Sequence, residues 1–242
     1  MQEYVMGNGA IALGALAAGV NLVAGYPGTP SSEILETISK YRHDGVYIEW
    51  SVNEKAAMEV AAAAAYSGAR AMVTMKQVGL NVAADPLMSL AYVGVKGGMV
   101  IVSADDPGPI SSQTEQDTRR FADFCRIPVF DPSSPEEAYK MIGDAFEYSE
   151  KYNTPVLFRP TTRVCHAYAS IDNCDSPSPK KYEGFVKDSK KWVIFPRLSF
   201  ANHIMIEKRN VEIGKDFSTY SANKAEGCLL YTSPSPRDPK TS

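Results

Sequence analysis

The sequence predicts an α/β domain over residues 1 to about 167, doubly wound, with a mostly parallel six-stranded sheet and helices on both faces. Short apolar, β-branched runs alternate there with helical patterns, as they do where helices join parallel strands. Most of these runs are apolar throughout, which is typical of strands that are covered on both faces. After Thr162 the alternation stops.

We expect six strands, at 22–24, 46–49, 71–75, 99–103, 128–130 and 156–159. Helical patterns precede the first strand and fill the intervals between strands, at 9–18, 32–41, 53–67, 81–92, 115–124 and 135–151. Because a helix separates each strand from the next, neighbouring strands should run parallel.

The remaining residues divide into two segments. Residues 168–227 are expected to form a linker and the start of a following domain: 172–191 carries two prolines and five lysines, and one amphipathic helix is expected at 200–213. Residues 228–242 are interpreted as a non-native tail, because CLLYTSPSPRD at 228–238 matches the translation of a transposon adapter used in sequencing libraries. A natural Ser/Pro-rich tail is the alternative. The gene is therefore expected to be longer than this chain.

The composition excludes several classes of function. Apolar residues make up 44% and charged residues 22%, and the net charge of -3 offers no basic surface to nucleic acid. No stretch predicts a membrane span, and the first residues lack the basic region of a signal peptide, so we expect a cytoplasmic protein. Its cysteines, at 125, 165, 174 and 228, follow no metal-ligand spacing.

In an open parallel sheet the ligand binds beyond the carboxyl ends of the strands, so the loops there are candidates for the site. The first loop, GYPGTP at 25–30, combines glycine, which lets a ligand approach, with proline, which stiffens the backbone. A plain strand-to-helix turn with Ser31 or Ser32 as N-cap explains the same residues. The loop matches neither a dinucleotide fingerprint nor a P-loop.

Glu54 follows the second expected strand and has two candidate roles. With Ser51 it forms the S-x-x-E pattern of a capping box, which would start the next helix. That helix is rich in alanine, whose small side chains allow close packing and a dry pocket, where a carboxylate could share a proton with a ring nitrogen. The pattern by itself leaves both roles open.

Other polar groups favour structural roles. Asp105, Asp106 and Asp117 could suggest Mg²⁺, but DDPG is also ordinary turn chemistry, and we prefer the turn. The three histidines lie in separate regions without a partner at an informative spacing. No metal ligand is expected in this chain.

Four motifs together carry a specific resemblance: GYPGTP at 25–30, EWSVNEK at 49–55, VTMKQVGLNVAADP at 73–86 and SADDPG at 103–108. With them the chain closely resembles the amino-terminal part of the alpha subunits of indolepyruvate:ferredoxin oxidoreductases, which are thiamine-diphosphate-dependent 2-oxoacid oxidoreductases. The similarity is dense over residues 1 to about 165 and looser toward residue 215. Each motif alone would be weak.

The resemblance implies that the first domain binds the aminopyrimidine ring of thiamine diphosphate. Glu54 stands at the position of the glutamate that hydrogen-bonds a ring nitrogen in this family, so it would be both catalytic and cofactor-binding. Gly28, Thr29 and Gln77 would lie at the cofactor as well. Gln77 is a departure, because many relatives are expected to carry histidine there, and this puts a proton-transfer role for that loop in doubt.

The substrate side is also assigned through the resemblance. The Thr29 hydroxyl would donate to the substrate carboxylate, and Ser111, Ser112 and Gln113 would line the same side. Arg119 would offer a bidentate grip on a carboxylate.

The implied reaction is the oxidative decarboxylation of aryl 2-oxoacids such as indolepyruvate. Coenzyme A would take the acyl group, and electrons would pass through [4Fe-4S] clusters to ferredoxin, with a beta subunit as partner. The ligands of the clusters and of Mg²⁺ are expected outside this fragment, which should be inactive alone. The preferred 2-oxoacid and the oligomeric state do not follow from the motifs.

Two alternatives remain at this point. A non-redox 2-oxoacid decarboxylase subunit would keep thiamine diphosphate and lack the clusters. A flavodoxin-like binding or regulatory module would leave Glu54 as a helix cap only.

Overall fold

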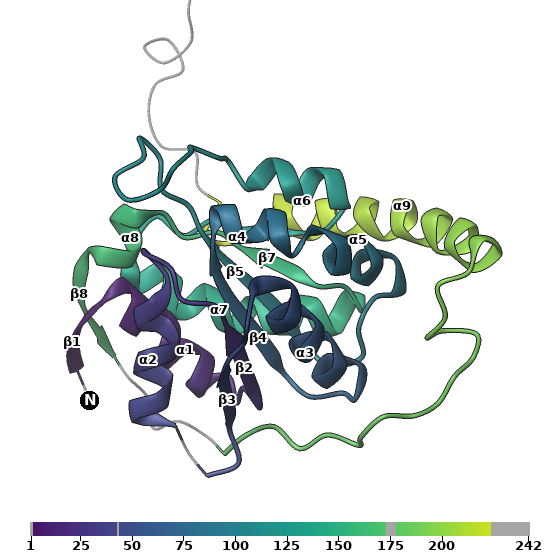
Figure 1. Ribbon diagram of the computed structural model, residues 1–242, viewed down its shortest axis with the longest axis horizontal. Helices are drawn as coiled ribbons and strands as arrows, with labels where there is room; N and C mark the ends of the chain where they lie inside the picture. Colours follow the sequence, from purple (N-terminus) through teal and green to yellow (C-terminus); the bar gives the residue numbers. More distant parts are fainter. Residues whose placement is uncertain (1, 43, 173–177, 224–242) are drawn as a thin grey trace, which may run out of the picture.

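The computed structural model describes residues 2–42, 44–172 and 178–223, and these residues contain the predicted parallel sheet (Figure 1). Its six strands are β2 (Leu22–Gly25), β3 (Tyr47–Trp50), β4 (Ala71–Lys76), β5 (Met99–Ala104), β6 (Val129–Phe130) and β7 (Val156–Phe158). They are ordered β3-β2-β4-β5-β7-β6, and every pair is parallel. The predicted fold class is confirmed, and each expected strand lies within one residue of its observed bounds.

The strand order places a topological switch between β2 and β4. β2 pairs with β3 on one side and with β4 on the other, so that Gly25 lies between Trp50 and Thr74. The chain leaves β2 in one direction and then returns to its opposite side. Loops diverge from the sheet at such a point, and the crevice between them is where open α/β sheets bind ligands.

Helices cover both faces of the sheet, as Figure 1 shows. α1 (Gly7–Ala17), α2 (Ser32–Tyr41) and α7 (Pro135–Tyr152) bury side chains such as Ile11, Ile34 and Phe146 on one face. α3 (Glu54–Tyr66), α5 (Ala84–Val93) and α6 (Arg119–Cys125) cover the other face. Successive strand residues enter different clusters, Met72 one and Val73 the other, because side chains alternate across a strand.

Some helix bounds differ from the predictions. The helix expected at 81–92 is divided into α4 (Gln77–Val82) and α5, and it begins four residues earlier. The helix expected at 115–124 begins only at Arg119, because the preceding residues form a loop that is bound to buried aspartates. α8 (Thr162–His166) was not predicted.

An antiparallel pair of strands lies beside the main sheet. β1 (Gln2–Met6) pairs with β8 (Tyr168–Asp172), with Tyr4 stacked on Tyr168 at 5.5 Å between ring centroids. β8 lies just beyond the boundary expected near residue 167, so this strand continues the first domain. A local pattern could not reveal it, since its partner lies at the other end of the domain.

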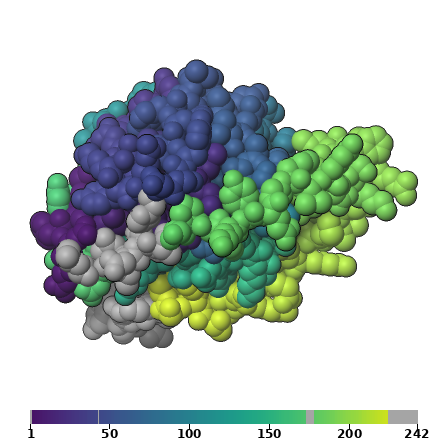
Figure 2. Space-filling view, turned by 90° about the horizontal axis from the view of Figure 1, so that it is seen from below, coloured from purple at the N-terminus to yellow at the C-terminus, as the bar shows by residue number. Residues whose placement is uncertain are grey.

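The segment after β8 returns to the domain surface. Residues 178–195 cross one face (green in Figure 2) and lead into α9 (Pro196–Ser218), which is longer than the predicted 200–213 helix. Phe217, in the last turn of α9, and Tyr220, just after it, pack edge-to-face on Phe130, with ring centroids 5.4 and 5.5 Å away. This helix therefore packs on the first domain. The interpreted tail at 228–242 lies outside the described residues.

Within the part of the chain that the structure describes, every helix is too short or too polar to cross a membrane.

Candidate functional site

Most of the predicted site residues gather at the switch between β2 and β4. Gly28 and Thr29 lie in the loop after β2, and Glu54 begins α3 after β3. Gln77 begins α4 directly after β4. Ser112 belongs to the loop that follows β5. These loops meet at the carboxyl edge of the sheet, as a parallel fold requires.

The capping-box interpretation of Glu54 is wrong. Asn53 is the N-cap of α3, and its Oδ1 accepts a hydrogen bond from the Ala56 N–H at 2.8 Å. Ser51 instead donates its hydroxyl to Glu49 at 2.6 Å. Because Asn53 caps the helix, the Glu54 side chain is released from that role.

Glu54 is a buried carboxylate at the rim of the crevice. The residue is only 9% exposed, and its carboxylate has no hydrogen-bond or ion-pair partner among the described residues. A carboxylate without a protein partner can accept a hydrogen bond from a ligand that brings a donor. That is the chemistry of a protonated ring nitrogen.

Gly79 lies against the Glu54 side chain and was not predicted as a site residue. A Cβ on Gly79 would collide with Oε1 of Glu54 and would lie 2.7 Å from Cγ and 2.9 Å from Cδ. Only glycine allows the carboxylate to lie there. The predicted helix begins only at residue 81, so the sequence pattern around Gly79 did not indicate this contact.

The loop after β2 is fixed by its own hydroxyls. The Gly28 N–H donates to Oγ of Ser32 at 2.8 Å, and the Ser31 hydroxyl donates to the Gly28 carbonyl at 3.0 Å. Ser31 is the N-cap residue of α2, but its side chain does not bond the helix. Buried Asn8 donates to the Pro30 carbonyl at 2.7 Å. Thr29 is exposed and has no partner among the described residues, so its hydroxyl remains available.

Gln77 is a bridge between α4 and the loop after β5. Its side chain is fully buried, its Nε2 donates to the Thr114 carbonyl at 2.8 Å, and its Oε1 accepts from the Asp106 N–H. One N–H of the amide remains for a ligand. The predicted cofactor contact of Gln77 stays a prediction, while the observed bonds give it a positioning role.

Asp106 shapes the loop that carries the predicted substrate residues. Its Oδ2 accepts the N–H groups of Ile110, Ser111 and Ser112 at 3.0, 2.9 and 3.1 Å, and Oδ1 accepts the Thr162 hydroxyl at 2.8 Å. Burial by itself would raise the pKa of Asp106, but these donors outweigh it and lower that pKa. The DDPG segment at 105–108 therefore begins a loop whose backbone is held by hydrogen bonds to the Asp106 carboxylate.

Asp105 belongs to a buried ion pair. Arg159 Nε donates to its Oδ2 at 2.7 Å, and Thr118 donates to it through the backbone and the hydroxyl. Burial raises the pKa of Asp105 despite these donors. No group of three or more potential metal ligands occurs in the described ranges.

The guanidinium of Arg119 is bound by two carboxylates. Its Nε and Nη2 bind both oxygens of Asp117 at 2.8 and 2.9 Å, and Nη1 donates to Asp131 at 3.3 Å. Because two carboxylates occupy the guanidinium, the bidentate grip on a substrate would require both contacts to break.

Lys76 supplies a cation at the crevice and was also missed. Its side chain runs past Gly28, where an added Cβ would lie 3.1 Å from Lys76 Cδ. Its Nζ donates to Oε1 of Gln113 at 3.5 Å, and it forms no ion pair with a described residue. The ammonium thus stands between two predicted site residues with its charge uncompensated.

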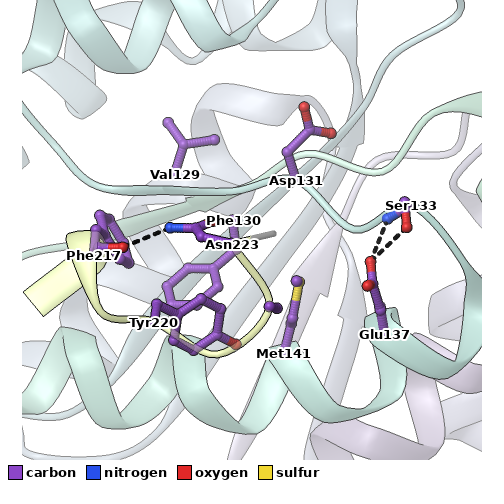
Figure 3. Close-up of a pocket in the computed structure, with 10 residues that line it drawn as sticks. Val129, Phe130, Asp131, Ser133, Glu137, Met141, Phe217, Tyr220 and Asn223 are labelled. Carbon is purple, nitrogen blue, oxygen red and sulfur yellow. Dashed lines mark hydrogen bonds between the residues drawn. The ribbon is translucent and has the colours of Figure 1, made fainter. Parts of the chain in front are cut away.

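A separate cavity lies at the end of β6. It has a volume of about 570 Å³ and is lined by residues of β6, α7 and the end of the α9 segment, among them Phe130, Glu137 and Tyr220 (Figure 3). Glu137 is bonded to Ser133, and the Tyr220 hydroxyl donates to Asp144 at 2.5 Å. None of the predicted site residues lines it.

Known proteins similar to this chain point to one family. Its residues 13–213 match the model of the pyruvate flavodoxin/ferredoxin oxidoreductase, thiamine diphosphate-binding family. Indolepyruvate oxidoreductase subunit IorA of Pyrococcus horikoshii is 43% identical over 92% of this chain, and that of Methanothermobacter marburgensis is 46% identical over 80%. The 2-oxoglutarate synthase subunit KorA of Methanocaldococcus jannaschii is 30% identical over 87%.

The chain spans about a third of the IorA relatives, 35% and 31% respectively, and 60% of the KorA relative. A solved 2-oxoglutarate:ferredoxin oxidoreductase from Magnetococcus marinus has a TM-score of 0.73 over 94% of this chain and 47% of its own. At 16% identity that likeness concerns the fold alone. The family match covers most of the chain, and the chain therefore belongs to the thiamine diphosphate-binding family of pyruvate flavodoxin/ferredoxin oxidoreductases.

Proposed function

We propose that this chain is the pyrimidine-binding part of an oxidoreductase that oxidatively decarboxylates aryl 2-oxoacids, with indolepyruvate as substrate and with coenzyme A and ferredoxin as co-substrates. The observation that carries the proposal is the unpartnered carboxylate of the largely buried residue Glu54, beside Gly79 at the switch of a thiamine-diphosphate-binding domain. The IorA relatives support indolepyruvate as the substrate.

The residues of the crevice fit an aminopyrimidine. Bound thiamine diphosphate supplies a carbon nucleophile for the 2-oxo group of the substrate. Glu54 would hold a proton at the pyrimidine ring nitrogen, because its carboxylate lacks another donor. Gly28 lets the Lys76 side chain approach the loop closely, and the remaining N–H of Gln77 has no described partner.

The substrate carboxylate would be held by Thr29 and Lys76 in place of Arg119. Thr29 has a free hydroxyl in the loop after β2, and the Lys76 side chain passes beneath that loop. Gln113, which accepts a hydrogen bond from the Lys76 ammonium, would orient it. Ser111 and Ser112 would line the same side, since Asp106 fixes their backbone.

The other parts of the reaction require residues or chains beyond these. A beta subunit, ferredoxin, Mg²⁺ and [4Fe-4S] clusters belong to the proposal, as does a cytoplasmic location. The subunit names of the relatives support a partner chain.

The decisive experiment uses the complete gene product together with its partner subunit. Indolepyruvate and coenzyme A should reduce ferredoxin, and Glu54→Gln should lower kcat/KM about 100-fold or more, which is the range for loss of acid–base catalysis. Glu59→Gln is the matched control, because Glu59 is exposed on the same helix. Decarboxylation without ferredoxin reduction would favour the non-redox decarboxylase, and equal rates for wild type and Glu54→Gln would overturn the assignment of Glu54.

A further inference from the structure

A second group of cations lies at the opposite edge of the sheet from Glu54. α5 and α7 lead into β5 and β7, so their last turns lie at the amino ends of those strands. α9 packs there: Asn202 donates to the Tyr92 carbonyl at 3.0 Å. A cavity of about 660 Å³ opens between these three helices. It is therefore separate from the candidate site, which lies at the carboxyl ends of β2 and β4.

The lining of this cavity is strongly positive. Five cations contribute to it: Lys151, Lys190, Lys191, Lys208 and Arg209. Among the described lining residues the only carboxylate is Glu212, and its Oε1 accepts a hydrogen bond from Lys215 at 2.8 Å. Lys151 has an acidic partner, Asp216. The remaining cations form no ion pair with a described residue, so the cavity holds an excess of positive charge.

Arg209 is the cation of this cavity that has unpartnered hydrogen-bond donors. Its Nε and Nη2 are buried and have no hydrogen-bond partner among the described residues. These two nitrogens form one side of the guanidinium fork, which can donate two parallel hydrogen bonds to an oxyanion. Burial lowers the pKa of Arg209 to about 10, which reflects the cost of a desolvated charge without a counter-ion.

We propose that this cavity is a binding site for a phosphate-bearing anion, which Arg209 grips through Nε and Nη2. Lys190, Lys191 and Lys208 supply charge for an anion that carries more than one negative charge. The volume lies within the usual range of small-molecule sites, so there is room for a ligand larger than a single carboxylate. A free diphosphate and the phosphates of a nucleotide share this chemistry.

Calorimetric titration of the 242-residue chain with inorganic pyrophosphate and with ADP tests the proposal. Pyrophosphate should bind, with an affinity that falls as salt is added. Arg209→Gln should weaken it by about tenfold or more, since a charge-assisted bidentate contact is lost. If ADP binds more tightly than pyrophosphate, the ligand is a nucleotide. If the two bind equally, the ligand is a free phosphate. The matched control is Arg197→Gln, an exposed arginine of the same helix that does not line the cavity. It should bind within twofold of wild type.

The proposal is overturned if the wild-type chain does not bind pyrophosphate, or if a folded Arg209→Gln variant binds as wild type does. Circular dichroism checks the fold of each variant. If Arg209→Gln unfolds, the double variant Lys190→Gln, Lys208→Gln decides, because both side chains are exposed. Unchanged binding in that variant would also overturn the site. Glu54 plays no part in these titrations, so their outcome is independent of the proposed function.

Discussion

The Glu54 carboxylate lies where a side chain on Gly79 would have to be. The carboxylate forms no hydrogen bond with a described residue, so its position depends on the room that Gly79 leaves. Gly79→Ala should therefore displace Glu54 and lower the activity of the assembled enzyme about tenfold or more, with overpacking costing about 1–3 kcal/mol of stability.

The control for that change is Gly143→Ala, because nothing lies within 4 Å of a Cβ added at Gly143 in α7. It should leave activity unchanged and stabilise the chain by up to about 1 kcal/mol through helix propensity. Steady-state kinetics and thermal unfolding measure both variants. Full activity in Gly79→Ala would show that Glu54 does not depend on this contact.

Asn53→Ala tests the observed helix cap. Loss of the bond from Oδ1 to the Ala56 N–H should cost about 1 kcal/mol, whereas Ser51→Ala should cost clearly less because Ser51 does not cap α3. Urea unfolding of the two variants compares them. A larger loss of unfolding free energy in Ser51→Ala than in Asn53→Ala would support the capping box instead.

Lys76→Met removes the ammonium at the crevice and keeps an unbranched side chain against Gly28. The KM for the 2-oxoacid should rise about tenfold, as expected for a lost charged hydrogen bond, while the affinity for thiamine diphosphate changes little. Lys40→Met, an exposed lysine at the end of α2, is the control. If Arg119→Met raises KM and Lys76→Met does not, the substrate carboxylate belongs to Arg119.

Asp106 should make the chain sensitive to acid. Its pKa is lower in the folded chain than its unfolded value of about 3.9, so its contribution is complete above that value and is lost as the pH falls through the folded pKa. Asp106→Asn should reduce stability at neutral pH and flatten the loss of stability below about pH 4. Thermal unfolding across pH measures this. An unchanged acid dependence in the variant would contradict the assignment.

The main sheet was predictable because its signals are local. β5 and β7 are buried along their whole length and, apart from Ser103 in β5, apolar, so composition alone located them. β1 and β8 escaped prediction, since each is stabilised by pairing with a segment at the other end of the domain.

The candidate site was only partly predictable. The motifs located Gly28, Thr29 and Glu54 in loops that do meet at the switch, whereas the two roles of Glu54 could not be separated in sequence. The structure excludes the capping box, because Oδ1 of Asn53 accepts the hydrogen bond from the Ala56 N–H. Lys76 and Gly79 gave no distinctive signal, because their significance lies in what stands opposite them.

The sequence by itself determined the fold class and the loops that carry the chemistry, because hydrophobic alternation and turn residues act over a few positions. Only the tertiary structure decided which charges are neutralised: Arg119 is bound by Asp117 and Asp131, while Lys76 and Arg209 have no counter-ion among the described residues. Whether a charge is paired depends on distances of a few ångströms between residues far apart in the chain, and folding alone sets those distances.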